Sequence, residues 1–497
     1  LGTRIEVLLD ERLFDISFRQ ALYTGGANTA GRLLSDLAGL RRFLSGNAPT
    51  ALLDAPWLPV YLLVMYLFHP LFGLFGALAA VVLLGLAWLS DRMTGQDAAD
   101  SVQLSREAAE SVHRNLRNAE TIEAMGMLAN IRERWLHHQV AALAAHGRAS
   151  RRGGSLAAVS RVLRMTVQSL VLGLGAWLVI GQQLTPGLMI AGAILLGRAL
   201  APVDQLIGSW RQLVQAREDY RRLHSMLDRV PEDPKRMPLP APTGALSVEK
   251  LSVAAPATRT PILTDISFAV EPGQLVGVIG ASASGKTTLA RAILGIWPSL
   301  AGSVRLDGAK LQDWDRESLG QHVGYMPQTV ELFDGSVAEN IARFGELDSD
   351  AVVAAARLAG VHDMILRLPQ GYDTAVGLGG SVLSAGQRQR VALARAFYGA
   401  PKLVVLDEPN SNLDDSGEAA LLAGLRELGR MGTTALVVSH RKTILAVVDK
   451  LVLLHQGRLV EAGPKEQVLE TLNRKISSLQ AHRAKSHVAV PGEPGDG

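Results

Sequence analysis

The sequence contains no cysteine among its 497 residues. Disulfide bridges, cysteine nucleophiles and thiolate-held metal ions are therefore excluded. A net charge of +3 is too small to indicate binding to nucleic acid. Hydrophobic residues make up 48% of the chain and charged residues 20%. In a chain long enough for two or more domains, this mixture predicts an apolar part joined to a polar part.

Charge is missing altogether from two long stretches of the N-terminal half. Residues 55–90 and residues 165–197 contain no Asp, Glu, Lys or Arg. Each stretch is too long for one membrane span of about 20 residues and suits two spans joined by a tight turn. Turns are indicated by His69-Pro70 in the first stretch and by residues 181–187 in the second. The alternative, buried helices of a soluble core, is disfavoured because such helices rarely lack charge over this length.

The four predicted membrane spans are residues 55–68, 71–89, 165–181 and 187–205. The segment between the two hairpins is rich in arginine, whereas neither turn contains Lys or Arg. By the positive-inside rule, this segment is cytoplasmic and both turns face outward. The segment has a helical pattern from 98 to 149 with a candidate turn at Gly126. We therefore expect the membrane helices to extend into the cytoplasm.

Five prolines between residues 231 and 242 mark a linker, because no helix accommodates them. We assign residues 1–230 to a membrane domain and residues 231–245 to this linker. From 246 to 472, short β-branched runs alternate with helical stretches, which is the pattern of an α/β domain. Residues 473–497 lack a core-forming pattern and are expected to form a flexible tail.

A glycine-rich loop follows the buried-strand pattern of residues 275–279. Because a helical pattern at 289–294 comes next, the loop has the strand–loop–helix context of a phosphate-binding P-loop. Its backbone N–H groups and the helix N-terminus would bind phosphates. Lys286 would reach the β- and γ-phosphates of ATP, and the Thr287 hydroxyl would bind Mg²⁺. The predicted nucleotide-binding residues are Gly280, Ala281, Ser282, Ala283, Ser284, Gly285, Lys286, Thr287 and Thr288.

A second apolar run, residues 403–406, ends in the two acidic residues Asp407 and Glu408. Buried acids normally need a partner, and an α/β sheet has its ligand site at the carboxyl ends of its strands. We therefore predict that Asp407 holds Mg²⁺ and that Glu408 is the general base that polarises the attacking water. The alternative is that the two acids cap the following helix.

The segment 383–390, Leu-Ser-Ala-Gly-Gln-Arg-Gln-Arg, precedes a helical pattern and resembles the signature motif of ABC ATPases. Gln328 resembles the Q-loop glutamine, and residues 411–414 resemble the D-loop. His440, at the end of another strand pattern, resembles the switch histidine. The resemblance implies an α-helical membrane domain of the ABC exporter type fused to an α/β P-loop NTPase domain.

In this family two nucleotide domains face head to tail, so the resemblance implies a homodimer with two equivalent sites. The phosphate loop of one chain and the signature of the other would enclose ATP. The implied catalytic residues are Lys286, Gln328, Glu408 and His440. The implied Mg²⁺ ligands are Thr287, Gln328 and Asp407. The signature residues acting in trans would be Ser384, Ala385, Gly386 and Gln387, and the D-loop residues would be Ser411 and Asp414.

Three stretches, residues 54–61, 197–205 and 407–414, resemble one branch of the family, the type I secretion ATPases of Gram-negative bacteria. The third has Pro409-Asn410 where most exporters carry Ala-Thr. The resemblance implies ATP-driven export of an unfolded protein of the protease or lipase class, with a C-terminal signal, across the bacterial inner membrane. The implied partners are membrane lipid, a periplasmic adaptor and an outer-membrane channel, with the ATPase domain in the cytoplasm and no nucleic acid. Residues 1–4 and 9–14 resemble the stretch after the second span of that branch, so two N-terminal spans are expected to be absent.

Three other functions are compatible with part of these patterns. An exporter of lipids or small molecules shares every ATPase motif and differs in what lines its path. A non-transport ABC ATPase is disfavoured by the two uncharged hairpins, and a membrane-anchored binding protein with an inactive ATPase is disfavoured by Glu408. Arg198 and Asp204, near the inner end of the last span, suit either a peptide path or a structural ion pair.

Four positions depart from the wider family pattern. Ala255 stands near the usual adenine-stacking aromatic residue, and Leu378 stands where exporters often have Glu. Ala283 and Ala385 replace glycines of the P-loop and the signature. Since an alanine is disfavoured where φ is positive, we expect a negative φ at both alanines.

Overall fold

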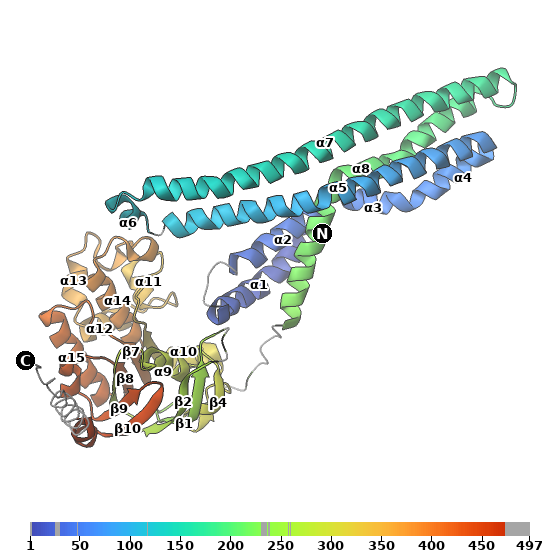
Figure 1. The fold of residues 1–497 in the computed structure, drawn as a ribbon. Helices are drawn as coiled ribbons and strands as arrows, with labels where there is room; N and C mark the ends of the chain where they lie inside the picture. The colour runs from blue at the N-terminus through green and yellow to red at the C-terminus, as the bar shows by residue number, and fades with distance from the viewer. Residues whose placement is uncertain are drawn as a thin grey trace, which may run out of the picture. The chain divides into compact units, whose positions relative to one another are not determined.

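The computed structural model describes residues 2–24, 30–46, 48–116, 118–229, 236, 239–256, 258 and 260–472, and Figure 1 shows its ribbon. The chain divides near residue 231 into two compact units. The first unit is helical and the second combines helices with two sheets. The predicted combination of a helical domain and an α/β domain is confirmed.

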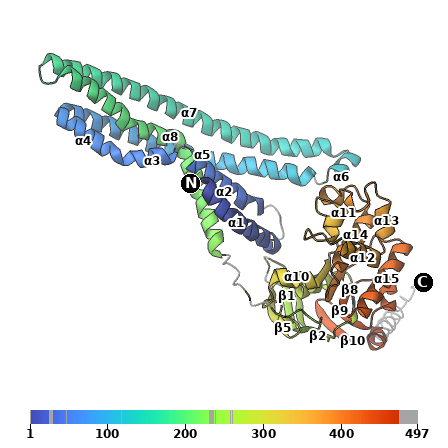
Figure 2. The ribbon, with the colours of Figure 1, turned by 180° about the vertical axis from the view of Figure 1, so that it is seen from behind.

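The helical unit contains three very long helices of 47, 53 and 44 residues, each far longer than a membrane span of about 20 residues. Its elements are α1 (Gly2–Thr24), α2 (Ala30–Leu44), α3 (Ala48–Asp54), η1 (Ala55–Trp57), α4 (Leu58–Phe68), α5 (Pro70–Leu116), α6 (Ala119–Ala124), α7 (Leu128–Ile180) and α8 (Pro186–Arg229). Helices α5 and α7 lie side by side in both views (Figures 1 and 2). At 1.5 Å per residue the 53 residues of α7 extend about 80 Å, whereas the hydrocarbon layer is about 30 Å thick. A large part of α7 must therefore lie outside any membrane that it crosses.

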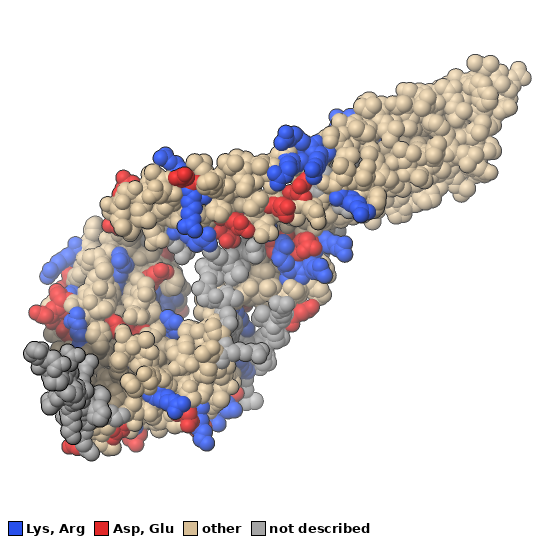
Figure 3. Space-filling model, viewed as in Figure 1, with Lys and Arg blue, Asp and Glu red and all other residues tan. Residues whose placement is uncertain are grey.

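One end of the helical unit has an apolar surface. Two helical segments, Ala48–Phe68 and Leu128–Ile180, are long and apolar enough to cross a membrane, and Pro70–Leu86 and Pro186–Pro202 are shorter apolar helices. Figure 3 shows a continuous surface free of Lys, Arg, Asp and Glu over this end. Large apolar side chains point outward there, as at Leu67, which is 74% exposed. Such a surface suits a lipid environment.

Two short breaks separate the apolar helices. His69 is extended (φ −161°, ψ 135°) between the end of α4 and Pro70, the first residue of α5. Residues 181–185 form a turn between α7 and α8. Inside the bundle, Phe72 is fully buried, and a Cβ on Gly175 or Gly192 would lie 3.1 or 3.2 Å from its ring. These glycines allow α7 and α8 to pack closely on α5.

The opposite part of the helical unit contains buried charge. The Arg222 guanidinium of α8 donates to Asp36 of α2 at 2.8 and 3.1 Å and also pairs with Asp219. Burial raises the pKa of Asp219, while Gln215 and Arg222 lower it. This cluster borders a cavity of about 590 Å³ lined by α2, α5, α7 and α8. Because paired charges are satisfied only in one geometry, the cluster fixes how α2 lies on α8.

The α/β unit contains a four-stranded sheet, in the order β2-β1-β4-β5, and a six-stranded sheet, in the order β10-β9-β3-β8-β7-β6. Its strands are β1 (Leu246–Ala254), β2 (Pro261–Val270), β3 (Leu275–Gly280), β4 (Ser299–Leu306), β5 (Ala309–Lys310), β6 (Val323–Met326), β7 (Leu403–Asp407), β8 (Thr434–Val438), β9 (Lys450–His455) and β10 (Arg458–Pro464). Its helices are α9 (Lys286–Ile293), α10 (Arg316–His322), α11 (Val337–Ile341), α12 (Ser349–Leu358), α13 (His362–Leu366), η2 (Gly371–Asp373), η3 (Leu378–Gly380), α14 (Ala385–Phe397), α15 (Asp415–Arg430) and η4 (Lys442–Ala446).

Strand β7, which lies between β8 and β6, separates two hydrophobic cores. Val404 and Leu406 contribute to the core that contains α14 and α15, whereas Leu403 and Val405 contribute to the core that contains α9 and β1. All four side chains are at most 1% exposed, and burying each contributes about 1.5–3 kcal/mol. Because successive side chains of a strand point to opposite faces, the apolar run 403–406 can fill both cores.

The parallel register places the ends of four strands together. Val278 of β3 and Asp407 of β7 both pair with Val438 of β8, and Leu406 pairs with Met326 of β6. The segments that leave these strands therefore start at the same edge of the sheet. They carry the phosphate loop, the acidic pair, His440 and Gln328, and this edge is where an α/β sheet positions its ligand site.

Candidate nucleotide-binding and catalytic site

The loop between β3 and α9 depends on glycine at two positions. A Cβ on Gly280 would lie 2.4 Å from the Leu454 carbonyl oxygen. Gly285, the residue before α9, has φ +98°, and a Cβ there would lie 2.5 Å from Leu263 Cδ2. The backbone can therefore turn tightly from the strand into the helix, which leaves N–H groups of the loop and of the first turn of α9 available for an anion.

Lys286 lies inside this loop. Its side chain is nearly buried, and Nζ donates to the carbonyl oxygens of Gly280 and Ala281 at 3.0 and 2.9 Å. The loop thus holds one ammonium group at its centre, with hydrogen bonds that a phosphate oxygen can replace. This is the position that the sequence prediction requires of Lys286.

The expectation of a negative φ is wrong at Ala283 and holds at Ala385. Ala283 has φ +61°, in the left-handed region where a Cβ crowds the following carbonyl group. The tight turn between two glycines imposes this conformation on the loop. Ala385 is instead the first residue of α14 and has helical geometry, which suits alanine.

Asp407, the last residue of β7, is a buried acid. It is fully buried, and neither carboxylate oxygen has a hydrogen-bond partner among the described residues. Burial and the charge of Glu408 raise the pKa of Asp407, while the charges of Arg291 and Lys286 lower it. An unpaired buried carboxylate is costly, so this position fits a cation.

Magnesium fits this arrangement better than a metal that needs a complete protein cage. No group of three or more His, Asp or Glu side chains in the described part of the chain could hold a metal ion. Mg²⁺ is commonly bound by one or two carboxylates together with substrate phosphates. Asp407 and Thr287 therefore suit Mg²⁺ that arrives with a nucleotide.

Three predicted catalytic residues come together next to Asp407. Glu408 Oε1 lies 3.4 Å from His440 Nδ1, and Gln328 Nε2 lies 3.4 Å from Glu408 Oε2. Glu408 has φ +51°, and its N–H donates to the Val438 carbonyl oxygen at 2.9 Å. This unusual backbone turn directs the chain away from the strand immediately after Asp407. One carboxylate thus has an amide on one side and an imidazole on the other, a geometry suited to orienting a water molecule.

The signature residues form the start of α14. The Ser384 N–H donates to Gln387 Oε1 at 2.8 Å, and the Gln387 N–H donates to Ser384 Oγ at 3.3 Å, which makes a capping box. In the described part of the chain each of these two side chains accepts from the backbone N–H of the other residue, and neither bonds to the phosphate loop. Gly386 lies against the D-loop, because a Cβ there would be 2.9 Å from the Asn412 carbonyl oxygen.

Sequence reasoning missed Gln389, which is 1% exposed and joins α14 to the D-loop. Its Nε2 donates to the Pro409 carbonyl oxygen at 2.5 Å and to Ser411 Oγ at 3.4 Å, and its Oε1 accepts from the Asn412 N–H at 3.0 Å. The available signal was helical spacing, since Gln389 shares the apolar face of α14 with Leu393. A polar residue on such a face indicates a buried hydrogen-bonding role.

The D-loop residue Asp414 caps α15. Its Oδ1 accepts from the Gly417 N–H at 2.9 Å, and the same carboxylate pairs with Arg390 of α14. The hydrogen bonds from Gly417 and Ser416 lower the pKa of Asp414, so the cap is ionised at neutral pH. The D-loop is thus fixed to both neighbouring helices.

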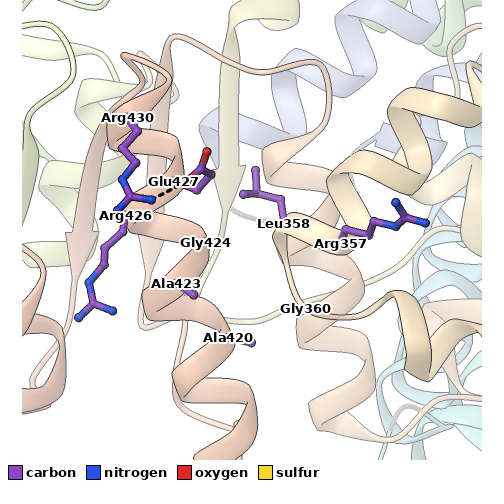
Figure 4. Close-up of a pocket in the computed structure, with 9 residues that line it drawn as sticks. All are labelled: Arg357, Leu358, Gly360, Ala420, Ala423, Gly424, Arg426, Glu427 and Arg430. Atoms are coloured by element: carbon purple, nitrogen blue, oxygen red, sulfur yellow. Dashed lines mark hydrogen bonds and ion pairs between the residues drawn. The ribbon is translucent and has the colours of Figure 1, made fainter.

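A hollow of about 500 Å³ lies elsewhere on the α/β unit, between the end of α12 and α15 (Figure 4). Its small residues are explained by close packing: a Cβ on Gly360 would lie 2.4 Å from Ala420 Cβ, and one on Gly424 would lie 2.4 Å from the Leu358 carbonyl oxygen. Its lining shares no residue with the motifs above, so it is not the nucleotide site.

The other sequence predictions fall partly on positions that the structure does not describe. Ala255 is half-buried, and Arg198 is exposed on α8. The side chains of Asp204 and Leu378 lie outside the described residues, as do residues 473–497 and, within the predicted linker, residues 231–235 and 237–238.

Comparison with known proteins agrees with this geometry. The ABC transporter family model matches residues 263–411, and the model for the ABC transporter transmembrane region matches residues 1–201. A bacterial Atm1-family ABC exporter with ATP bound has the same fold, with a TM-score of 0.82, 24% identity, and coverage of 99% of this chain and 86% of that one.

The sequence relatives are secretion proteins. The chain is 49% identical to the type I secretion system ATP-binding protein PrsD of Rhizobium meliloti over 88% of this chain and 75% of that protein. It is 31% identical to the cyclolysin secretion/processing ATP-binding protein CyaB of Bordetella pertussis, over 97% of this chain and 69% of that protein. It is 30% identical to the leukotoxin translocation ATP-binding protein LktB of Mannheimia haemolytica, over 96% of this chain and 68% of that protein. The chain therefore belongs to the ABC transporter family, with a transmembrane region and an ATPase domain, and is a homologue of the type I secretion ATP-binding proteins.

Proposed function

We propose that this chain is the ATP-driven exporter subunit of a type I secretion system. The observation that carries the proposal is the 49% identity to PrsD over 88% of the chain, which includes both the membrane unit and the ATPase unit. The geometry adds that Lys286, Asp407, Glu408 and His440 lie at the same sheet edge. A chain with these residues is equipped to hydrolyse ATP.

The ATPase unit supplies each group that the hydrolysis needs. Lys286 and the backbone N–H groups around it bind the phosphates. Asp407 and the Thr287 hydroxyl would hold Mg²⁺, which neutralises charge that develops on the phosphate oxygens. Glu408 accepts the proton of the attacking water, and His440 and Gln328 hold this carboxylate and the water in place.

The working unit in this proposal is a homodimer. Each chain has one phosphate loop and one signature, and the capping box of Ser384 and Gln387 fixes the start of α14 within its own chain. Residues 384–387 of one copy would therefore complete the ATP site of the other. Two equivalent sites result from the two-fold symmetry.

The membrane unit is proposed to lie in the bacterial inner membrane, with the ATPase unit in the cytoplasm. The exported molecule would be an unfolded protein of the protease or lipase class with a C-terminal signal. It would pass to a periplasmic adaptor and an outer-membrane channel. The names of PrsD, CyaB and LktB support secretion or translocation as the common activity of these relatives.

The test is substrate-dependent ATPase activity of the full chain in lipid vesicles. We expect the C-terminal segment of a protein secreted by the same cell to change the ATPase rate, because a ligand that binds two transporter conformations differently shifts their populations. A scrambled segment of the same composition is the control. Modulation by lipids or small molecules, with no response to any secreted protein, would contradict protein export and favour the alternative exporter class.

A further inference from the structure

The loop after Glu408 contains a buried residue, Asn410, whose side-chain amide forms hydrogen bonds through both its nitrogen and its oxygen. Asn410 is 1% exposed. Its Nδ2 donates to Glu418 Oε1 at 3.0 Å, and its Oδ1 accepts from Ser439 Oγ at 3.3 Å. It belongs to the Pro409-Asn410 pair that distinguishes this loop from that of most exporters. The ATPase chemistry described above assigns it no role.

Glu418, on helix α15, is the centre of this network. Besides Asn410, it accepts from Thr443 Oγ1 at 2.5 Å and from Arg441 Nη1 at 3.4 Å. The donors Thr443 and Asn410 lower the pKa of Glu418, so the group is ionised at neutral pH. Its side chain is 13% exposed, and water competes little for these hydrogen bonds. The carboxylate is therefore a firm anchor for the segments around it.

The segments anchored on Glu418 flank His440 in the sequence. Ser439, the residue before His440, is buried and bonds to Asn410, and its Oγ also accepts from the Arg441 N–H at 3.1 Å. Arg441, the residue after His440, pairs with Glu418 directly. Of the two neighbours of the histidine, Arg441 is thus tied to the Glu418 carboxylate directly and Ser439 through Asn410, which belongs to the loop that carries Glu408.

Among the described residues, the His440 side chain has Glu408 as its polar partner. It is 63% exposed, so packing does not fix its direction. Its 3.4 Å approach to Glu408 must therefore depend on the backbone on either side. The position of such a side chain is therefore only as well defined as the positions of the groups that hold its neighbours.

We infer that Asn410 and Glu418 are positioning residues that fix the His440 segment relative to Glu408. The inference rests on the proposed ATPase function and deepens it, because it names the groups that join the two catalytic loops. Neither residue needs to touch ATP. Their effect on turnover is exerted through His440.

The test is a double-mutant cycle on the full chain in lipid vesicles, with the variants Asn410→Leu and His440→Ala. Leucine has a similar size and removes both hydrogen bonds. We expect Asn410→Leu to lower kcat about tenfold or more, because small displacements of a catalytic group cost this much or more. Equilibrium binding of ATP should change by less than about threefold, since the phosphate loop is untouched. In the His440→Ala background the same substitution should have little further effect on the residual rate.

The matched control is Thr433→Val, which removes one buried hydrogen bond, from Thr433 Oγ1 to the Pro401 carbonyl oxygen at 2.7 Å, without touching either catalytic loop. It should leave kcat within about twofold of the unmodified chain. Ser439→Ala serves as a second variant should Asn410→Leu fail to fold, and it should lower kcat in the same direction and show the same dependence on His440.

Two results would overturn the inference. One is an unchanged kcat in both Asn410→Leu and Ser439→Ala. The other is an equal loss with and without His440, which would mean that the network acts through stability alone. An unmodified chain without ATPase activity would instead contradict the proposed function, so the two failures are distinguishable.

Discussion

At the scale of single residues, the phosphate loop contains one strained position. Ala283 adopts φ +61° although it carries a Cβ. The left-handed conformation costs an L-amino acid roughly 1–2 kcal/mol. Replacing the residue by glycine removes this strain, but part of the gain in stability is lost because glycine makes the unfolded chain more flexible. The strain is local to the loop that must surround the phosphates, so it affects folding of the ATPase unit directly.

We expect Ala283→Gly to raise the free energy of unfolding of the ATPase unit by about 0.5–1 kcal/mol. In a domain of this size that corresponds to a rise of roughly 2 °C in the unfolding midpoint, measurable by calorimetry of the full chain in detergent. Ala385→Gly is the matched control, and we expect it to shift the unfolding midpoint in the opposite direction. Ala385 is helical, so glycine there should lower the midpoint. Shifts of the same sign in both variants would contradict the assignment of strain to Ala283.

The second prediction at this scale concerns Glu408. Replacing its carboxylate by an amide keeps the size and the contacts but removes the proton acceptor. Glu408→Gln should therefore lower ATP turnover by at least about a hundredfold and leave ATP binding intact. Steady-state ATPase assays and equilibrium nucleotide binding check the two parts separately. Glu427→Gln on the exposed face of α15 is the control, and turnover of Glu408→Gln within a few-fold of the unmodified chain would rule out the general-base role.

At the scale of elements, the membrane unit depends on close contacts between helices. A Cβ on Gly175 of α7 would lie 2.5 Å from Met189 Cγ of α8 and 3.1 Å from the Phe72 ring of α5. Gly173, two residues earlier in the same helix, has open space at this position. The two glycines therefore provide a matched pair on one helix.

We expect Gly175→Val to destabilise the membrane unit by about 1–3 kcal/mol, because the added methyl groups overpack the contact of α7 with α5 and α8. Gly173→Val should have an effect of less than about 0.5 kcal/mol. The measurement is the midpoint of thermal aggregation of both variants in the same detergent. Equal losses would show that the glycine contact does not determine helix packing.

Sequence reasoning recovered the elements whose signals are local. The apolar run 275–279, the glycines of the loop and the helical pattern after them are contiguous, so their strand–loop–helix structure could be predicted without the fold. The acidic pair at 407–408 was predictable for the same reason. The bond between Gln389 and the Pro409 carbonyl oxygen joins positions that are apart in the sequence, and it depends on how α14 packs against the six-stranded sheet. The φ of Ala283 likewise follows from the closed loop, not from the residue type.

At the scale of the whole molecule, the proposed dimer makes a prediction that a self-contained ATP site does not. Each chain carries one phosphate loop and one signature, and the capping box of Ser384 bonds within its own helix in the described structure. In a head-to-tail dimer, the Lys286 of one chain and the Ser384 of the other serve the same ATP. Lys286→Ala and Ser384→Arg should each inactivate both sites of a homodimer, the first by removing a phosphate ligand and the second by filling the contact position with a bulky cation.

Mixing the two inactive variants should restore activity. In a mixed dimer both lesions fall in one composite site, so the other site contains an intact Lys286 and an intact Ser384. When equal amounts pair at random, half of the dimers are mixed and each mixed dimer has one whole site. About a quarter of the ATPase activity of the unmodified protein is therefore expected.

The measurement is the ATPase rate after the variants are co-expressed or exchanged in detergent, with each variant treated alone as the control. If each site were built from one chain, every site would carry a lesion and the mixture would show the average of its parents. A rise well above both parents therefore distinguishes a site shared between two chains from a site contained in one.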